Sequence, residues 1–332
     1  MVAQIDAAYI KSRPTKLISR IISYALFEGR PLTVRGQWIN PLVFAQLAFW
    51  KHLPQTHKVK GPIYILGTGR SGTTILGMLL SMHRDVGFLN EPKAMWHTIY
   101  PHEDVIGSYD RGEAHYRLFA KDATPEVCKI AHKLFGGYLL STLSSRIVDK
   151  YPELIFRVPF IRTIFPDARF IFLVRSGWET CASIEAWSKK NIKANGEEIF
   201  DWWGVNRRKW HLMLDQLVEP DPYFSSALGS IRGFESHLDM AATEWVVTMR
   251  EGLRVKQEYG EAVHLLKYED MVNSPVGTLG KLLEFCELPN DERFWRYAKA
   301  TLRKTNPHEP YMLHPAIFPL FRETLNNLGY VT

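Results

Sequence analysis

The sequence has few cysteines, no long apolar run and no low-complexity segment. Cys128, Cys181 and Cys286 are its three cysteines, and none has the Cys-x-x-Cys spacing of a zinc or redox site. We therefore expect neither a disulfide framework nor a metal site. No apolar run approaches the roughly 18 residues of a membrane span, and no leader-like pattern opens the chain. These absences predict a soluble cytoplasmic protein in a reducing compartment.

Charge of one sign is also weak. Lys and Arg number 41 against 35 Asp and Glu in 332 residues. This dispersed basic excess suits an anionic ligand but does not indicate a nucleic-acid partner. With 46% hydrophobic residues the chain has enough apolar side chains for a large core. No linker divides it, so we expect a single domain over 61–332, preceded by an extension over 1–60.

The extension contains two apolar segments, "KLISRIISYALFEGRP" and "NPLVFAQLAFW". The first has helical spacing with basic residues on one side. A helical hairpin packed on the main domain accounts for both segments. A peripheral contact with a membrane surface or a partner is the alternative.

From residue 62 onward, short apolar runs alternate with longer helical patterns. Strands are predicted at "IYIL", "VGFL", "LIFRV", "RFIFLV" and "VHLLKY". The helical patterns between them cover 73–83, 124–151, 178–190 and 239–259. This order predicts an α/β fold of three layers, a central parallel sheet with helices on both faces.

Four charged residues follow predicted strands. They are Arg70, Glu91, Arg157 and Arg175. In such sheets, ligands bind beyond the carboxyl ends of the strands. Three cations and one carboxylate at these ends predict a pocket for an anionic ligand.

The loop "GTGRSGTT" follows the first of these strands and resembles the phosphate-binding loop of nucleotide hydrolases. Its glycines let backbone N–H groups converge on an anion, and a helix begins at Thr73. The lysine expected after Gly72 is absent, and Arg70 precedes it instead. An ATP or GTP enzyme also needs an aspartate at a strand end for Mg²⁺, where this chain has Arg175. Glu269 and Asp270 keep a small-molecule kinase as the alternative.

Four segments together resemble the sulfotransferases that use 3′-phosphoadenosine 5′-phosphosulfate (PAPS). They lie in the family's order between about residues 62 and 290. "GTGRSGTT" is similar to the 5′-phosphosulfate loop, and "FPDARFIFLVRSGWETCASI" to the 3′-phosphate segment. "LLKYEDMVNSP" is similar to the Tyr-Glu segment. "FLNEPKAMWH" is similar to the Glu-Pro segment of the carbohydrate members, and the tyrosylprotein members also have a glutamate there.

The resemblance implies a P-loop-like fold and roles for particular residues. PAPS would be the donor and adenosine 3′,5′-bisphosphate (PAP) the product, without a metal. Glu91 would be the base, with Arg70 and Arg157 as cationic catalysts. The donor-binding residues would be Gly69, Arg70, Ser71, Gly72, Thr73, Thr74, Arg175, Ser183 and Tyr268.

Several features depart from the family or stay open. "RSGW" replaces the usual Arg-Asp-Pro-Arg, and Arg303 and Lys304 are the candidates for the basic loop that closes over the donor. His97 and His102 are rival bases. The stretch 201–210 either lines an acceptor cleft or packs through its tryptophans. The acceptor is open and could be a hydroxyl or an amine of a saccharide or small metabolite. The oligomeric state is also open. A non-catalytic nucleotide-binding regulator is an alternative function.

Overall fold

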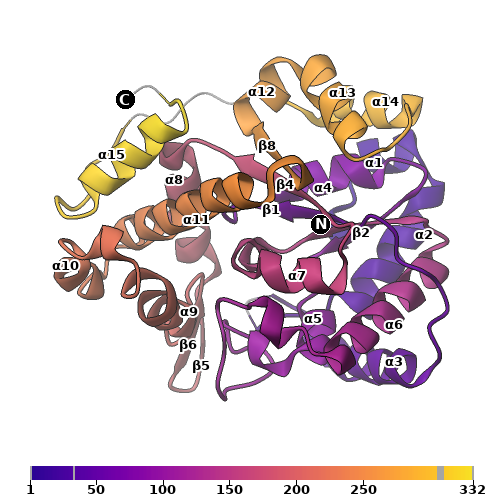
Figure 1. Ribbon diagram of the computed structural model, residues 1–332, viewed down its shortest axis with the longest axis horizontal. Helices are drawn as coiled ribbons and strands as arrows, with labels where there is room; N and C mark the ends of the chain where they lie inside the picture. Colours follow the sequence, from indigo (N-terminus) through magenta and orange to yellow (C-terminus); the bar gives the residue numbers. More distant parts are fainter. Residues whose placement is uncertain (1, 33, 305–309, 331–332) are drawn as a thin grey trace.

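The computed structural model describes residues 2–32, 34–304 and 310–330. At its centre is a five-stranded sheet in the order β2-β3-β1-β4-β8, in which every pairing is parallel (Figure 1). The strands are β1 (Ile63–Leu66), β2 (Val86–Asn90), β3 (Arg146–Lys150), β4 (Arg169–Val174) and β8 (Val263–Lys267). The predicted parallel α/β sheet is confirmed.

Alternate side chains of the buried strands enter two separate cores. In β1, Ile63 and Ile65 join one apolar cluster, whereas Tyr64 and Leu66 join the other. Both faces of the sheet are therefore covered, and the fold has three layers. The helices of the main domain are α4 (Thr73–Ser81), α5 (Lys93–Ile99), α6 (Pro125–Thr142), α7 (Val158–Ile164), α8 (Gly177–Asn191), α9 (Arg208–Met213), α10 (Leu228–Arg232), α11 (His237–Tyr259), α12 (Tyr268–Asn273), α13 (Pro275–Phe285), α14 (Glu292–Thr301) and α15 (Phe318–Asn327).

One predicted strand is wrong and another was missed. Residues 152–157 form a 3₁₀ helix that runs into α7, with Pro152 and Pro159 in the first turns of the two helices. The missed strand is β3, which lies inside the helical pattern predicted over 124–151. Helix α6 stops at Thr142 because Leu143 is left-handed, with φ 50°. The chain then turns into the sheet.

A second, small antiparallel sheet lies beside the main one. It consists of β5 (Lys193–Asn195), β6 (Glu198–Asp201) and β7 (Gly204–Val205). Trp203 lies between β6 and β7, and Trp210 lies in α9. Both are buried, with ring centroids 5.5 Å apart. These two tryptophans serve packing.

The N-terminal helices α1 (Ala7–Ser12), α2 (Thr15–Ile22) and α3 (Asn40–His52) pack on the main domain. Helix α2 turns its polar side inward: the Lys16 amine donates to the Val86 carbonyl at 2.5 Å, and the Arg20 guanidinium to that of Phe88 at 3.3 Å. These carbonyls belong to β2, the edge strand. The helix therefore covers a sheet edge that would otherwise be open to another strand.

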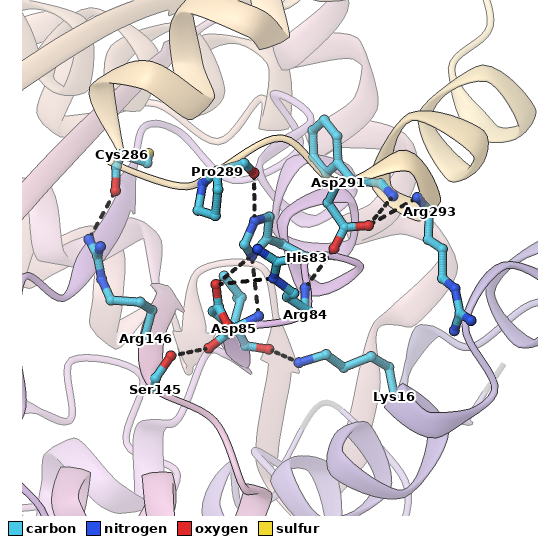
Figure 2. Close-up of polar contacts among 12 residues, drawn as sticks. Lys16, His83, Arg84, Asp85, Ser145, Arg146, Cys286, Pro289, Asp291 and Arg293 are labelled. Carbon is cyan, nitrogen blue, oxygen red and sulfur yellow. Dashed lines mark hydrogen bonds and ion pairs between the residues drawn. The ribbon is translucent and has the colours of Figure 1, made fainter.

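A polar network at the amino ends of the strands links this region to the C-terminal helices (Figure 2). His83 is buried, and its Nε2 lies 2.8 Å from the Pro289 carbonyl. The Asp291 carboxylate accepts the backbone N–H groups of Arg84 and Arg293, both at 3.0 Å. Arg13 adds an ion pair to Asp291 at 2.5 Å. The network fixes the end of the sheet opposite the predicted pocket.

Candidate active site

A cavity of about 1000 Å³ opens at the carboxyl ends of the strands. Nine of the eleven predicted site residues line it, and they come from the ends of β1, β2, β4 and β8 and from α8. They are Gly69, Arg70, Gly72, Thr73, Thr74, Glu91, Arg175, Ser183 and Tyr268. The volume lies at the upper end of the range for small-molecule sites. Ser71 and Arg157 do not line it.

The loop between β1 and α4 is fixed by close contacts at its glycines. A side chain at Gly72, whose φ is 99°, would come within 2.4 Å of the Tyr268 ring, and one at Gly69 within 2.5 Å of the Trp202 ring. The Ser71 hydroxyl turns inward and donates to the Thr68 carbonyl at 2.6 Å. The glycines are thus required by packing, and Ser71 stabilises the loop from within.

Arg70 and Arg175 lie side by side over this loop. The Arg70 Nε donates to the Ser183 hydroxyl at 3.2 Å, and the Arg175 guanidinium donates to the Arg70 carbonyl at 3.4 Å. The Arg175 guanidinium also lies 4.6 Å from the Tyr268 ring centre. Burial and the neighbouring Arg175 lower the pKa of Arg70. Two adjacent cations whose contacts are a hydroxyl, a carbonyl and a ring form a site for an anion.

Glu91 follows β2 and faces two lysines. Its carboxylate lies 2.5 Å from the Lys150 amine and 3.5 Å from the Lys93 amine. Burial raises the pKa of Glu91, but the two lysines outweigh burial and lower it to about 2. The Glu91 backbone is left-handed, with φ 55°, a strained conformation for a non-glycine residue. The carboxylate is ionised and held in the cavity by its two ion pairs.

Arg157 lies elsewhere, and its predicted position at a strand end is wrong. The side chain is buried in an ion pair with Glu103, 2.8 Å between Nη1 and Oε2, and also donates to the Glu103 carbonyl. Burial raises the pKa of Glu103 to about 7, although Arg157 and the Tyr151 hydroxyl oppose this rise. Arg157 is thus committed to the protein interior.

Lys150, at the end of the missed strand β3, is a further cation that lines the cavity. Its side chain is buried except where it meets Glu91 and lines the cavity. Lys150 lies two residues before Pro152, and Arg157 lies two residues before Pro159, so both cations precede a proline at the same spacing. This spacing, together with a short strand over 146–150, could have identified Lys150 as a candidate from the sequence.

The small sheet supplies the wall that faces the loop. Trp202 lies against Gly69, and its indole N–H donates to Glu244 at 2.6 Å. The Lys209 amine binds the same carboxylate at 2.6 Å and lies 4.8 Å from the Trp202 ring centre. The stretch 201–210 divides between the cavity and the interior: Asp201, Trp202 and Lys209 line the cavity, while Trp203 and Trp210 pack. That this wall binds the acceptor stays a prediction.

Residues of the extension form a further wall, which the sequence did not predict. Tyr24, Glu28, Arg30, Pro31, Val34 and Arg35 line the cavity. Arg30 is buried, with its guanidinium 3.4 Å from the Tyr24 ring centre and donating to the Gly29 and Tyr24 carbonyls. The extension is therefore part of the site.

The remaining candidates lie outside the large cavity. His97 packs between the rings of Phe44 and Tyr109, and His102 lies beside His115. Arg303 donates to the carbonyls of its own helix end. Lys304 lines a second cavity of about 80 Å³ that shares Arg175 and Tyr268 with the first. The two predicted rival bases thus do not reach the site.

Residues 62–224 match the family model described as "Sulfotransferase family". This segment, just under half of the chain, is similar to the sulfotransferase family. The match spans the glycine loop, Glu91, Lys150, Arg175 and Ser183.

Two curated proteins resemble this chain. An uncharacterized protein of Aquifex aeolicus is 26% identical over 262 residues, 73% of this chain and 28% of that protein. The nodulation protein NoeE of Sinorhizobium fredii is 25% identical over 129 residues, 37% of this chain and 30% of that protein. The chain matches less than a third of the length of either relative.

Solved sulfotransferase structures also resemble the chain. A sulfotransferase domain of the curacin biosynthetic pathway aligns with 83% of this chain and 99% of its own, at 14% identity and a TM-score of 0.46. The domain from the Synechococcus PCC 7002 olefin synthase aligns with 84% and 98%, at 16% identity and a TM-score of 0.48. STF9 from Mycobacterium avium aligns with 98% and 93%, at 14% identity and a TM-score of 0.47.

Proposed function

We propose that this chain transfers a sulfuryl group from PAPS to a hydroxyl group of a saccharide or small metabolite. The observation that carries the proposal is the composition of one cavity. It combines a glycine loop and two arginines, suited to an anionic donor, with an ionised glutamate paired to a lysine. An amine acceptor would use the same arrangement.

The donor's two phosphate groups match two parts of the site. The 5′-phosphosulfate is assigned to the loop, where Gly72, Thr73 and Thr74 begin α4 and the helix dipole favours an anion. The 3′-phosphate is assigned to Arg175 and Ser183. Tyr268 would then contact the adenine, beside the second cavity. The two parts adjoin, because the Arg70 Nε donates to the Ser183 hydroxyl.

The chemical step resembles phosphoryl transfer, with a loose, in-line transition state. The acceptor oxygen forms a bond to sulfur while the bond from sulfur to the 5′-phosphate oxygen breaks, and PAP leaves. Negative charge builds on that oxygen, and Arg70 and Lys150 stabilise it. We assign Lys150 the electrostatic role that the sequence suggested for Arg157.

The acceptor's proton goes to Glu91 in this proposal. A carboxylate whose pKa is about 2 is a weak base. The two lysines cause this low pKa, and Lys150 is shared between Glu91 and the donor. As the Lys150 amine turns toward the leaving oxygen, the ion pair between Lys150 and Glu91 weakens. The pKa of the Glu91 carboxylate then rises, and the carboxylate becomes more basic.

Two alternatives predict different behaviour. A kinase would bind Mg-ATP, but Arg175 occupies the strand end where such enzymes hold the metal, and Glu269 is engaged by the Ser176 N–H and the Tyr330 hydroxyl. A non-catalytic regulator would bind PAP and transfer nothing.

The testing experiment incubates the purified chain with PAPS labelled in its sulfur and a panel of saccharides and hydroxylated metabolites. We expect label in at least one acceptor, with equimolar PAP. Lys150→Met should remove the transfer, whereas Lys281→Met, a change at an exposed lysine on α13, should not. PAP binding without transfer to any acceptor would favour the regulator.

A further inference from the structure

Helix α3 presents large apolar side chains to solvent along one line. Trp38, Leu42 and Phe49 are 83%, 56% and 60% exposed. At about 100° per residue, Leu42, Ala45 and Phe49 lie within a narrow arc of one face of α3, and Trp38 stands in the 3₁₀ helix Gln37–Ile39 that runs into α3. The opposite face is already used, because Val43 and Leu47 are fully buried in the core. This outer face, the α3 stripe (Trp38, Leu42 and Phe49), is apolar without serving the core.

Exposed apolar side chains are concentrated in the extension. Of the fifteen exposed large apolar side chains in the described residues, seven lie between residues 10 and 49. Three of the seven, Ile10, Ile18 and Ile21, result from the inward polar side of α1 and α2. Figure 1 places α2, α6 and α3 along one side of the molecule. Such a concentration is typical of an interaction surface.

The extension that contains this surface is strongly basic. Residues 1–60 contain nine Lys and Arg but two Asp and Glu, which leaves 32 and 33 in the rest of the chain. Both carboxylates are engaged: Asp6 accepts the Tyr9 N–H at 2.6 Å, and Glu28 is buried against Arg20. The exposed charged side chains of residues 2–32 and 34–60 are Lys11, Arg35, Lys58 and Lys60, apart from histidines.

We propose that the α3 stripe and its basic surroundings dock on the surface of an anionic lipid bilayer. An exposed apolar helix face on a basic extension matches a layer of acyl chains beneath anionic headgroups. A second copy of the chain fits less well, because a two-fold interface would bring this basic surface against itself. No helix in the described part of the chain is both long and apolar enough to cross a bilayer. The contact is therefore peripheral.

The stripe begins close to the cavity. Val34 and Arg35 line the cavity, and Trp38 follows three residues after Arg35. Docking through the α3 stripe brings the part of the cavity wall formed by Val34 and Arg35 close to the headgroup layer. If the proposed sulfotransfer holds, an acceptor anchored in the bilayer could be reached there.

The test is flotation of the full chain with vesicles of phosphatidylcholine alone or with about one third phosphatidylglycerol. We expect binding to the anionic vesicles, weakened at high salt. The triple variant Trp38→Gln, Leu42→Gln, Phe49→Gln should bind at least about tenfold less. The matched control changes three exposed apolar residues elsewhere, Ile192→Gln, Val276→Gln and Met312→Gln, and should bind like the wild type.

Melting temperature, PAP affinity and molar mass are measured on the same proteins. Unchanged melting and PAP binding show that the triple variant is folded and separate this test from the proposed function. The proposal is overturned if the wild type stays off anionic vesicles or if the triple variant floats with them equally. It is also overturned if the wild type is a dimer that the triple variant alone dissociates.

Discussion

Glu91→Gln tests stability and chemistry at one residue. The change keeps the shape of the side chain but leaves Lys150 and Lys93 without their carboxylate. The pKa of Glu91 is lowered from 4.5 to about 2, which corresponds to about 3 kcal/mol at 1.36 kcal/mol per pKa unit. Since 33% of the side chain is exposed, solvent screening reduces this to about 2 kcal/mol of unfolding free energy at pH 7.

The pH dependence of this loss has a definite sign. The folded protein holds Glu91 ionised at a lower pH than the unfolded chain does, so ionisation favours folding above pH 4.5. This stabilisation is lost as the pH falls from about 4.5 to about 2. The difference between wild type and Glu91→Gln should therefore be largest near neutrality and shrink in that interval.

Urea unfolding at pH 7 and pH 3.5 measures the two differences. Glu126→Gln is the matched control, because Glu126 is exposed and its ion pair within the described residues is a surface contact with Lys129 at 3.9 Å. This change should alter stability by less than about 0.5 kcal/mol. In the transfer assay, Glu91→Gln should lower kcat by about 10²–10⁴ and keep PAP affinity. Unchanged stability would refute the ion-pair account, and retained turnover would refute the base.

Three further predictions concern the donor site and its scaffold. Arg175→Ala should weaken PAP binding by about 1.5–3 kcal/mol and Ser183→Ala by less; calorimetry that finds full affinity in both would place the 3′-phosphate elsewhere. Lys150→Met should lose turnover and stay folded. Arg157→Met should instead lower the melting temperature by leaving Glu103 unpaired in the interior, and the reverse pattern would restore Arg157 to the chemistry. Gly72→Ala should cost about 1–3 kcal/mol and weaken PAP binding, because of its φ of 99° and the Tyr268 ring. Gly280→Ala in α13, with open space around it, should be neutral or stabilising; equal losses in both would contradict the packing argument.

The parts of the site that the sequence predicted are those that local pattern determines. A glycine loop between a β-branched or aromatic run and a helix predicts an anion site from the local sequence alone. Arg70, Glu91 and Arg175 follow such runs, and the structure brings all three into one cavity.

The misassignment of Arg157 has a physical cause. "LIFRV" has strand composition, but Pro152 and Pro159 favour turns and helix starts, and burial of Leu154, Ile155 and Phe156 is met by a 3₁₀ helix. Residues 146–150 continue a helical pattern, and only the left-handed Leu143 and pairing with β1 and β2 make them a strand. Tertiary pairing overrode local propensity here, and Lys150 was lost with the strand.

The role of the extension also depends on tertiary contacts. Its apolar segments predicted helices, but nothing in their spacing indicated that Lys16 and Arg20 would bind the edge of the sheet. That inward polar face sets which side of α2 meets solvent. Tyr24, Glu28, Arg30 and Arg35 of the extension line the cavity.

Calorimetric titration of the purified chain with PAP, in a buffer without divalent cations, tests the central claim most directly. A site made of Arg70, Arg175 and the glycine loop should bind PAP with a Kd in the micromolar range, about −8 kcal/mol. Added Mg²⁺ should leave this affinity unchanged. Tight binding of Mg-ATP together with no binding of PAP would contradict the account and favour a kinase.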